Sequence, residues 1–136
     1  MTHQQINPEG LLPPVGFSHA VVSPPGRTVW LGGQTGHHGD GSLDEGLVAQ
    51  FRQALRNLVT VLEHAGAHIE DVVSMQLFVT DVAAYRAAPK ELGAAYREVL
   101  GKHFPAIALF GIAELLDPDA VIEIVATAVI ARGADA

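Results

Sequence analysis

The sequence predicts an α+β fold, in which two helices cover one face of a β-sheet in the order β-β-α-β-α-β-β. The chain has 136 residues, 49% of them hydrophobic, which is enough for a single compact core. Two segments repeat apolar residues every three or four positions, as amphipathic helices do. Several short β-branched runs alternate as strands do, and no internal repeat divides the chain. We therefore expect one domain over residues 1–136.

The N-terminal part should contribute little to the core. Residues 7–16 hold three prolines and two glycines, so we expect residues 1–16 to be rich in loops. Residues 20–22 and 28–31 are short apolar or β-branched runs on either side of Ser-Pro-Pro-Gly-Arg at 23–27. This turn signal predicts a β-hairpin between the two runs.

Two helices follow from periodicity and from their end signals. Apolar residues from Leu47 to Ala65 predict a long helix that Gly66 ends, with Ser42 or Asp44 as the N-terminal cap. Pro89 suits the first position of a second helix because its missing N–H group is not needed there. Residue 101, a glycine, should close that helix.

Three further strands are predicted over residues 72–80, 106–112 and 121–130. In the last one, alternate side chains are apolar on both faces of the strand. Two helices can cover only one face of a sheet, so the faces led by Val121 and by Ile107 should lack a cover within the chain. We expect a second copy of the sheet to cover them, which predicts a homo-oligomer.

Composition excludes several classes of function. Fifteen acidic residues against eight Lys and Arg give a net charge of −7, which argues against nucleic acid as a partner. The chain has no cysteine, and therefore no disulfide, thiolate nucleophile or cysteine-ligated metal. No apolar run approaches the roughly 20 residues of a membrane span, and the N-terminus lacks the order of a signal peptide. A cytoplasmic protein without membrane partners is expected.

Glu123 is the candidate catalytic residue. It is the only ionisable residue between positions 121 and 130. A lone carboxylate among apolar neighbours suits a general acid or base that works near neutral pH. The alternative is that Glu123 lies at an exposed rim or pairs with a cation across a subunit interface.

The glycine-rich loop and the histidines give weaker signals. Residues 32–41 include five glycines, but no lysine precedes Lys90, so a P-loop is absent. The loop either lets a small ligand approach the backbone or only connects two elements. His37 and His38 are adjacent, and Gly66 interrupts the helix between His64 and His68. We therefore expect structural or surface roles for the histidines and no metal site.

Taken together, these landmarks make the sequence resemble the RidA/YjgF family of small trimeric proteins. The resemblance covers about residues 15–130, and the ordered set carries it rather than any single motif. It implies a chorismate-mutase-like fold and a homotrimer whose sheets meet in a central barrel, with three ligand pockets between subunits. The landmarks are Phe17-Ser18-His19-Ala20-Val21, Gly33-Gln34, Gln50, Asn57-Leu58, Ala65-Gly66, Asp71-Val72-Val73, Phe78-Val79-Thr80-Asp81, Phe104-Pro105-Ala106 and Ile122-Glu123-Ile124.

The resemblance also implies an activity. Active members of the family hydrolyse reactive imines or enamines to a carbonyl compound and ammonia, with no metal or organic cofactor. By this resemblance Glu123 activates water, and the pocket positions are Phe17, Gly32, Gly93, Ile107 and Leu109, the last through its backbone carbonyl.

The pocket departs from the family pattern. An arginine that anchors the substrate carboxylate is replaced by Ile107, at a cost of about 2 to 5 kcal/mol in a buried site. A serine and an asparagine are replaced by Gly32 and Gly93. The substrate should therefore differ from short 2-imino acids. The alternative is a small-metabolite-binding protein without catalysis, and RNA cleavage ranks third because of the net charge.

Overall fold

A computed structural model describes residues 3–131 of the chain. They form two β-sheets and three α-helices, which confirms the predicted α+β class. In chain order the elements are β1 (Gln4–Ile6), β2 (Ala20–Val22), β3 (Arg27–Thr35), α1 (Leu47–His64), the 3-10 turn η1 (Ile69–Asp71), β4 (Val72–Val79), α2 (Val82–Ala87), α3 (Pro89–Leu100), β5 (Ala106–Gly111) and β6 (Ile122–Ile130).

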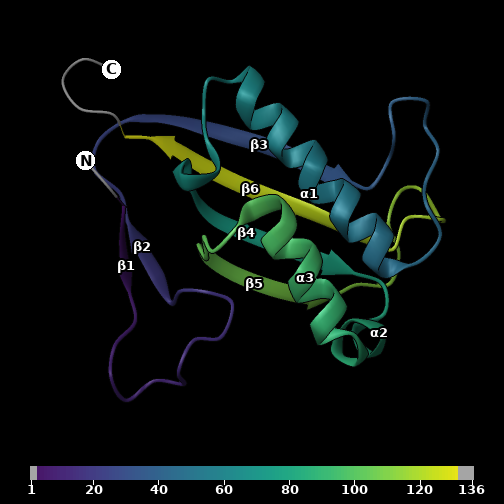
Figure 1. The fold of residues 1–136 in the computed structure, drawn as a ribbon, viewed down its shortest axis with the longest axis horizontal. Coiled ribbons are helices and arrows are strands. Elements are labelled where there is room, and N and C mark those ends of the chain that lie inside the picture. The colour runs from purple at the N-terminus through teal and green to yellow at the C-terminus, as the bar shows by residue number, and fades with distance from the viewer. Residues whose placement is uncertain (1–2, 132–136) are drawn as a thin grey trace.

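The main sheet has four strands in the order β3-β6-β4-β5. Strand β6 is antiparallel to both of its neighbours, whereas β4 and β5 are parallel and are connected through α2 and α3. Helices α1 and α3 lie side by side over one face of this sheet (Figure 1). The small sheet of β1 and β2 lies to one side of them.

The core lies between these helices and the main sheet. The buried face of α1 repeats every three or four residues, as the sequence predicts, and Leu55, Leu58 and Leu62 are fully buried. On the sheet side, Ile122 and Ile124 of β6 are also fully buried. Burying side chains of this size stabilises the fold by roughly 1.5 to 3 kcal/mol each.

Several predicted ends are confirmed and one is wrong. Helix α1 is followed by Gly66 with φ of 78°, and α3 begins at Pro89 and is followed by Gly101 with φ of 66°. The start of α1 differs from the expectation. Its N-cap is Gly46, with φ of 96° and no side-chain hydrogen bond, so neither Ser42 nor Asp44 caps the helix.

The predicted hairpin between residues 20–22 and 28–31 is also wrong. Strand β2 pairs with β1, which lies in the segment expected to be rich in loops, and β3 pairs with β6. The turn before β3 lies against the end of β6, where a Cβ atom at Gly26 would lie 2.4 Å from the Ile130 carbonyl oxygen. The turn signal is real, but it joins two different sheets.

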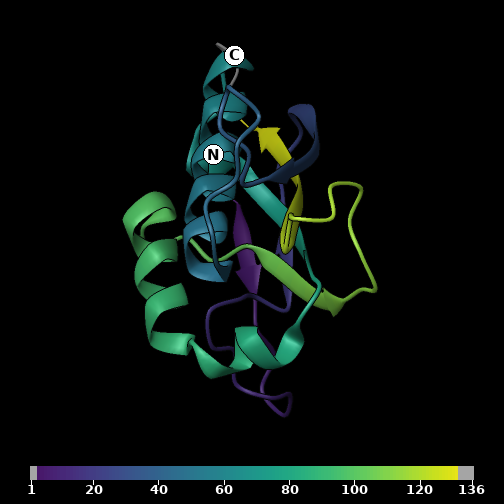
Figure 2. The same cartoon turned by 90° about the vertical axis from the view of Figure 1, so that its right-hand side faces the viewer.

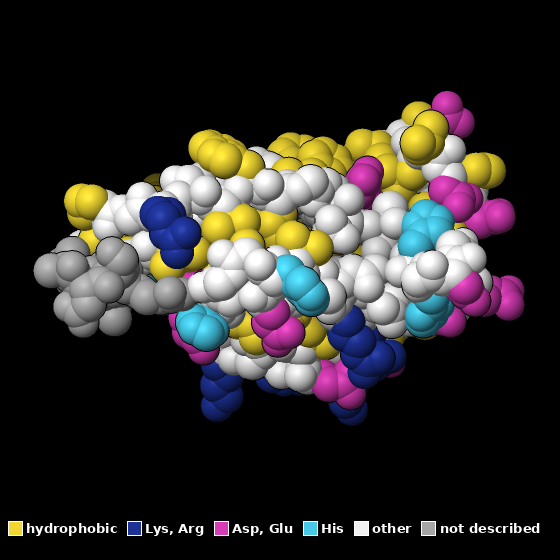
Figure 3. Space-filling view, turned by 90° about the horizontal axis from the view of Figure 1, so that it is seen from above, with side chains coloured by type: hydrophobic (Ala, Val, Ile, Leu, Met, Phe, Trp, Pro, Cys, Tyr) yellow, Lys and Arg dark blue, Asp and Glu magenta, His cyan; other side chains and the backbone are white. Residues whose placement is uncertain are grey.

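The face of the main sheet opposite the helices, which we call the open face, has no cover within the described residues. Along β6 the buried residues alternate with half-buried ones, and the half-buried set faces the open side. Trp30 is 80% exposed and Phe110 is 47% exposed. Hydrophobic side chains gather along the upper edge of Figure 3, on the side opposite most of the Lys and Arg residues in this view. The half-buried set in β6 is Glu123, Val125, Thr127 and Val129.

One part of the predicted open face is wrong. Ile107 and Leu109 pack against the core, and Ala108, Phe110 and Gly111 are the exposed residues of β5. The register explains the difference, because Ile107 pairs with Met75, which is buried under the helices. In paired strands, opposed residues point to the same face.

None of the helices within residues 3–131 is both long enough and apolar enough to cross a membrane.

Candidate functional site

A row of four side chains crosses the open face at the level of Glu123. Glu123 in β6 is the direct partner of Thr35 in β3 and of Phe78 in β4. Phe78 in turn pairs with Phe110 in β5, and their rings stack at a centroid distance of 5.5 Å. Since opposed residues share a face, the row places a carboxylate between a hydroxyl group and an aromatic pair.

Gly33 leaves the space that the Glu123 carboxylate occupies. The pairing of β3 with β6 is interrupted between Leu31 and Gln34, which brings Gly33 against the Glu123 side chain. A Cβ atom at Gly33 would lie 2.4 Å from Glu123 Oε1 and 2.8 Å from its carboxyl carbon. Within residues 3–131 the carboxylate makes no hydrogen bond or ion pair. Its oxygens are therefore available to a ligand or to water.

The Glu123 carboxylate borders a cavity of about 370 Å³. One wall comes from the end of β3 and the residues after it. The other comes from the loop between β5 and β6, which projects from the sheet on the side away from the helices (Figure 2). The lining residues are Thr35, His37, Leu115, Leu116, Asp117 and Glu123.

His37 connects the two walls of this cavity. Its Nε2 lies 2.8 Å from Asp117 Oδ2, and its Nδ1 is hydrogen-bonded to Thr35 Oγ1. The hydrogen bond from His37 lowers the pKa of the Asp117 carboxyl, and a hydrogen bond from the Asp119 backbone N–H lowers it further. Asp117 is therefore ionised and can only accept, so Nε2 of His37 carries a proton.

Helix α1 holds both loops that carry these residues. The Asn57 side chain donates to the carbonyl oxygens of Thr35 and His37, at 2.9 and 2.8 Å. Gln50 is 3% exposed and donates to the Asp119 carbonyl at 3.1 Å, and its Oε1 accepts from the Val121 N–H at 2.9 Å. The two side chains are seven residues apart and so lie on the same face of the helix.

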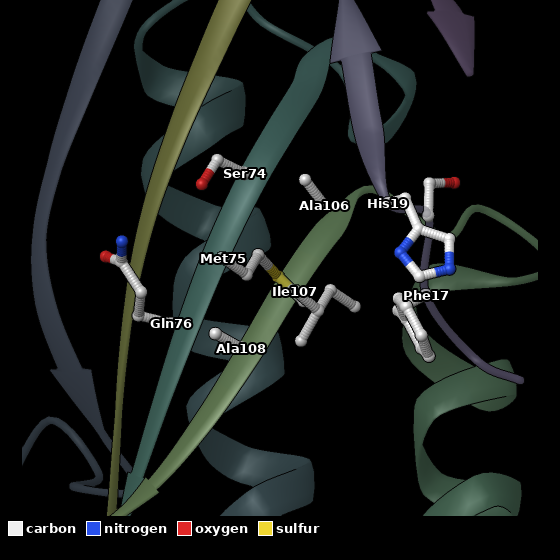
Figure 4. A pocket seen from close by; sticks show the side chains of 9 residues that line it. Phe17, His19, Ser74, Met75, Gln76, Ala106, Ile107 and Ala108 are labelled. Atoms are coloured by element: carbon white, nitrogen blue, oxygen red, sulfur yellow. The ribbon is translucent and has the colours of Figure 1, made fainter. Parts of the chain in front are cut away.

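A second cavity, of about 300 Å³, lies at the outer edge of β5. Ser18 ties the preceding loop to this edge: its N–H donates to the Pro105 carbonyl at 3.0 Å and its hydroxyl to the Phe104 carbonyl at 2.7 Å. Phe17 and His19 therefore lie across from Ile107, as Figure 4 shows. The His19 ring donates to the Leu12 carbonyl at 2.8 Å.

The structure brings some of the expected site residues together and separates others. Phe17 and Ile107 line the second cavity, whereas Glu123 lines the first. Ile107 is level with Ala126, three residues along β6 from Glu123. The roles expected for the whole set therefore remain predictions.

The three other expected positions lie in three different elements. Gly32 is exposed in β3 beside Gly33, and a Cβ atom added to it would meet nothing within 4 Å. Gly93 lies within α3, where Arg97 Nη1 would be 3.2 Å from an added Cβ atom. Leu109 in β5 is half-buried and packs on the core.

Sequence reasoning misses the residues around Glu123. Thr35 gives no signal in the sequence, and Asp117 stands out there only as part of a turn. His37 belongs to a pair of adjacent histidines, but His38 binds Asp44 instead, at 3.0 Å. Within residues 3–131, no three His, Asp or Glu side chains lie close enough to hold a metal ion.

Comparisons with known proteins agree with this architecture. The family model described as endoribonuclease L-PSP matches residues 9–130. The RutC family protein UK114 of Drosophila melanogaster is 32% identical over 110 residues, which are 79% of this chain and 75% of that protein. A RutC family protein of Pasteurella multocida is 34% identical over 89 residues, 65% of this chain and 68% of that protein.

Solved structures extend the likeness to the fold. YyfB from Yersinia pestis, a Rid family protein of unknown function, is 38% identical with a TM-score of 0.83, covering 96% of this chain and 100% of that one. RidA from an Antarctic Psychrobacter is 29% identical with a TM-score of 0.68, covering 93% and 99%. The chain therefore belongs to the RidA/YjgF family, to which the endoribonuclease L-PSP model also refers.

Proposed function

We propose that this protein hydrolyses a reactive imine or enamine metabolite to the carbonyl compound and ammonia, with Glu123 as the general base. One observation carries the proposal: an unpaired carboxylate lies over Gly33 at the edge of a cavity, on an otherwise largely apolar sheet face. Family membership supports the same reaction class.

The chemistry needs no group beyond the chain and water. A water molecule attacks the electrophilic imine carbon, and the Glu123 carboxylate accepts the proton that the water loses. Transfer of a proton to the nitrogen gives the carbinolamine. As the carbinolamine collapses, its hydroxyl group loses a proton, the nitrogen gains one, the C–N bond breaks and ammonia leaves with the electrons of that bond. The Leu109 carbonyl is a second acceptor for the water, carried over from the family pattern.

We further propose that the complete site forms between subunits of a homotrimer. The apolar open face supports assembly, because water would otherwise contact residues such as Trp30 and Phe110. The separation of the cavities in one chain supports a shared site: a neighbouring subunit would bring its Phe17 and Ile107 to the Glu123 cavity.

The lining of the second cavity narrows the range of possible substrates. No Lys or Arg belongs to the part of it that the structure describes, and the hydrocarbon Ile107 makes no contact with a carboxylate. We expect a substrate that lacks the carboxylate of short 2-imino acids or that is larger and more apolar.

The test is turnover by wild type and Glu123→Gln. Imines are made in situ from a panel of L-amino acids and of amines by the corresponding oxidases, and accelerated release of the carbonyl compound is measured. Glu123→Gln keeps the shape of the side chain but removes the basic oxygen. Turnover should fall about 100-fold, the contribution of a positioned general base, with ligand affinity nearly unchanged.

The second candidate is a small-metabolite-binding protein without catalysis, which the missing arginine at Ile107 favours. In that case no imine in the panel is hydrolysed faster than in buffer, and Glu123→Gln changes ligand affinity alone. If the variant instead dissociates or unfolds the protein without affecting ligands, Glu123 is a structural residue and the catalytic proposal is wrong.

A further inference from the structure

Three side chains form a hydrogen-bonded chain that ends beside Glu123. Asp117 Oδ2 and His37 Nε2 are 2.8 Å apart, and His37 Nδ1 is hydrogen-bonded to Thr35 Oγ1. Thr35 is the direct cross-strand partner of Glu123, so their Cβ atoms are about 5 Å apart on the same face. A single small ligand in the cavity can therefore touch both side chains.

The protonation state of His37 decides what the Thr35 hydroxyl can do. In the neutral ring Nδ1 has only a lone pair, so Thr35 must donate its proton to His37. In the imidazolium form Nδ1 donates to the Thr35 oxygen, and the hydroxyl proton is free to point into the cavity. The ionised Asp117 carboxylate accepts the Nε2 proton and so directs Nδ1 toward the Thr35 hydroxyl.

From this geometry we infer that Asp117, His37 and Thr35 form a proton relay in which Thr35 is the general acid that protonates the substrate nitrogen. The inference rests on the proposed function and adds a second catalytic residue to it. Thr35 touches the substrate, whereas His37 and Asp117 are positioning residues that act through the Thr35 hydroxyl.

The proton balance of the step is complete. Water forms a C–O bond to the imine carbon and loses one proton to Glu123, while the C=N π electrons move to nitrogen. The nitrogen takes the Thr35 proton, and His37 replaces it from Nδ1. The proton of the carbinolamine hydroxyl group then moves to the amino nitrogen through solvent, the C–N bond breaks, and ammonia leaves with the electrons of that bond as the carbonyl compound forms. The proton on Glu123 returns to His37 through solvent.

Side chains of helix α1 hold both loops that carry the relay. Asn57 fixes the backbone of Thr35 and His37, and its own Oδ1 accepts from Gln53 at 2.9 Å. Gln50 fixes the other loop through Asp119 and Val121. The charged side chains that line the cavity with His37 are Asp117 and Glu123, and the neighbouring His38 is engaged by Asp44.

The first arm of the test compares Thr35→Val, Thr35→Ser and Thr28→Val, with turnover of the imine panel as the readout. Thr35→Val keeps the shape and removes the proton donor, so kcat should fall about 100-fold with little change in KM. Thr35→Ser keeps the hydroxyl and should lose far less. Thr28→Val makes the same change at an exposed position of the same strand and should leave turnover unchanged.

The second arm compares kcat and KM of Asp117→Asn with those of wild type. Asp117→Asn keeps the shape of the side chain but removes the charge that orients His37, so kcat should fall at least about tenfold with little change in KM. A purely structural role for Asp117 would raise KM or lower Tm and leave kcat near that of wild type. This arm decides the matter if Thr35→Val fails to fold.

The outcomes separate the relay from the proposed function. If Glu123→Gln abolishes turnover while Thr35→Val matches Thr35→Ser and Asp117→Asn retains the kcat of wild type, the relay alone is wrong. If wild type hydrolyses no imine, or Glu123→Gln retains full turnover, the proposed function fails and the relay fails with it.

Discussion

Glu123 reaches its cavity because the residue against it has no side chain. Any other residue at Gly33 would place a carbon atom 2.4 Å from the carboxylate oxygen, well inside van der Waals contact. The glycine therefore contributes to the site through its small volume. Its neighbour Gly32 has no such contact, although both lie in the irregular part of β3.

We expect Gly33→Ala to displace the Glu123 carboxylate and to lower turnover by at least about tenfold, since the proposed catalysis depends on placing this carboxylate within a fraction of an ångström. The thermal midpoint Tm should change little, because the contact is with the end of a flexible side chain. Turnover and Tm are measured for each variant.

Gly32→Ala is the control for folding, since its added methyl group meets nothing within 4 Å. Equal turnover in Gly33→Ala and wild type would show that the carboxylate need not lie over residue 33.

At the scale of elements, α1 does more than cover the sheet. It carries Gln50 and Asn57 two turns apart, and each binds backbone groups of a loop that forms part of the Glu123 cavity. Gln50 makes three such bonds, to Asp44, Asp119 and Val121. The helix thus sets the distance between the loop of His37 and the loop of Asp117.

Gln50→Leu should therefore destabilise the protein by about 2 kcal/mol, because it leaves backbone donors and acceptors without partners at a buried position. The measurement is urea unfolding at one protein concentration.

Arg56→Leu is the matched control on the same helix. Its side chain is 54% exposed and makes only a 3.4 Å ion pair with Glu98, so the change should stay within about 0.5 kcal/mol. A loss in Gln50→Leu no larger than in this control would contradict the role of Gln50 in holding the two loops.

The elements show which parts of the fold the sequence could predict. The end of α1 at Gly66 and the start of α3 at Pro89 follow from local periodicity and local backbone preferences, and both predictions are confirmed. The hairpin prediction is wrong because strand pairing is a long-range choice. The turn at 23–27 fits equally well between two strands of different sheets.

The site is less predictable than the fold. Glu123 stands out as the only charge in an apolar strand, which a sequence reveals directly. Its neighbours Thr35 and Asp117 come from distant segments, and their proximity depends on strand register and on a bulge at Gly33. Alternation alone puts Ile107 on the wrong face, because it does not say which set of residues the helices cover.

At the scale of the whole molecule, one chain leaves a large apolar surface to water. The open face combines the exposed Trp30 and Phe110 with the half-buried alternate residues of β6. Exposed apolar surface of this kind marks an interaction site. A closed trimer would bury the open face of each of its three subunits. It would also bring the two separate cavities of each chain against those of the neighbouring chains.

Val125→Lys tests this assembly directly. Val125 lies on the open face in the middle of β6, so in the proposed trimer each copy of the lysine would bury an unpaired ammonium group. Ala94→Lys, at an exposed position of α3, introduces the same side chain away from the sheet and serves as the control.

The measurement is light scattering at micromolar concentration. Wild type and Ala94→Lys should give about 43 kDa, three times 14.3 kDa, and Val125→Lys should give the mass of one chain. A monomeric wild type would exclude the trimer, and a trimeric Val125→Lys would show that assembly uses a surface other than the open face.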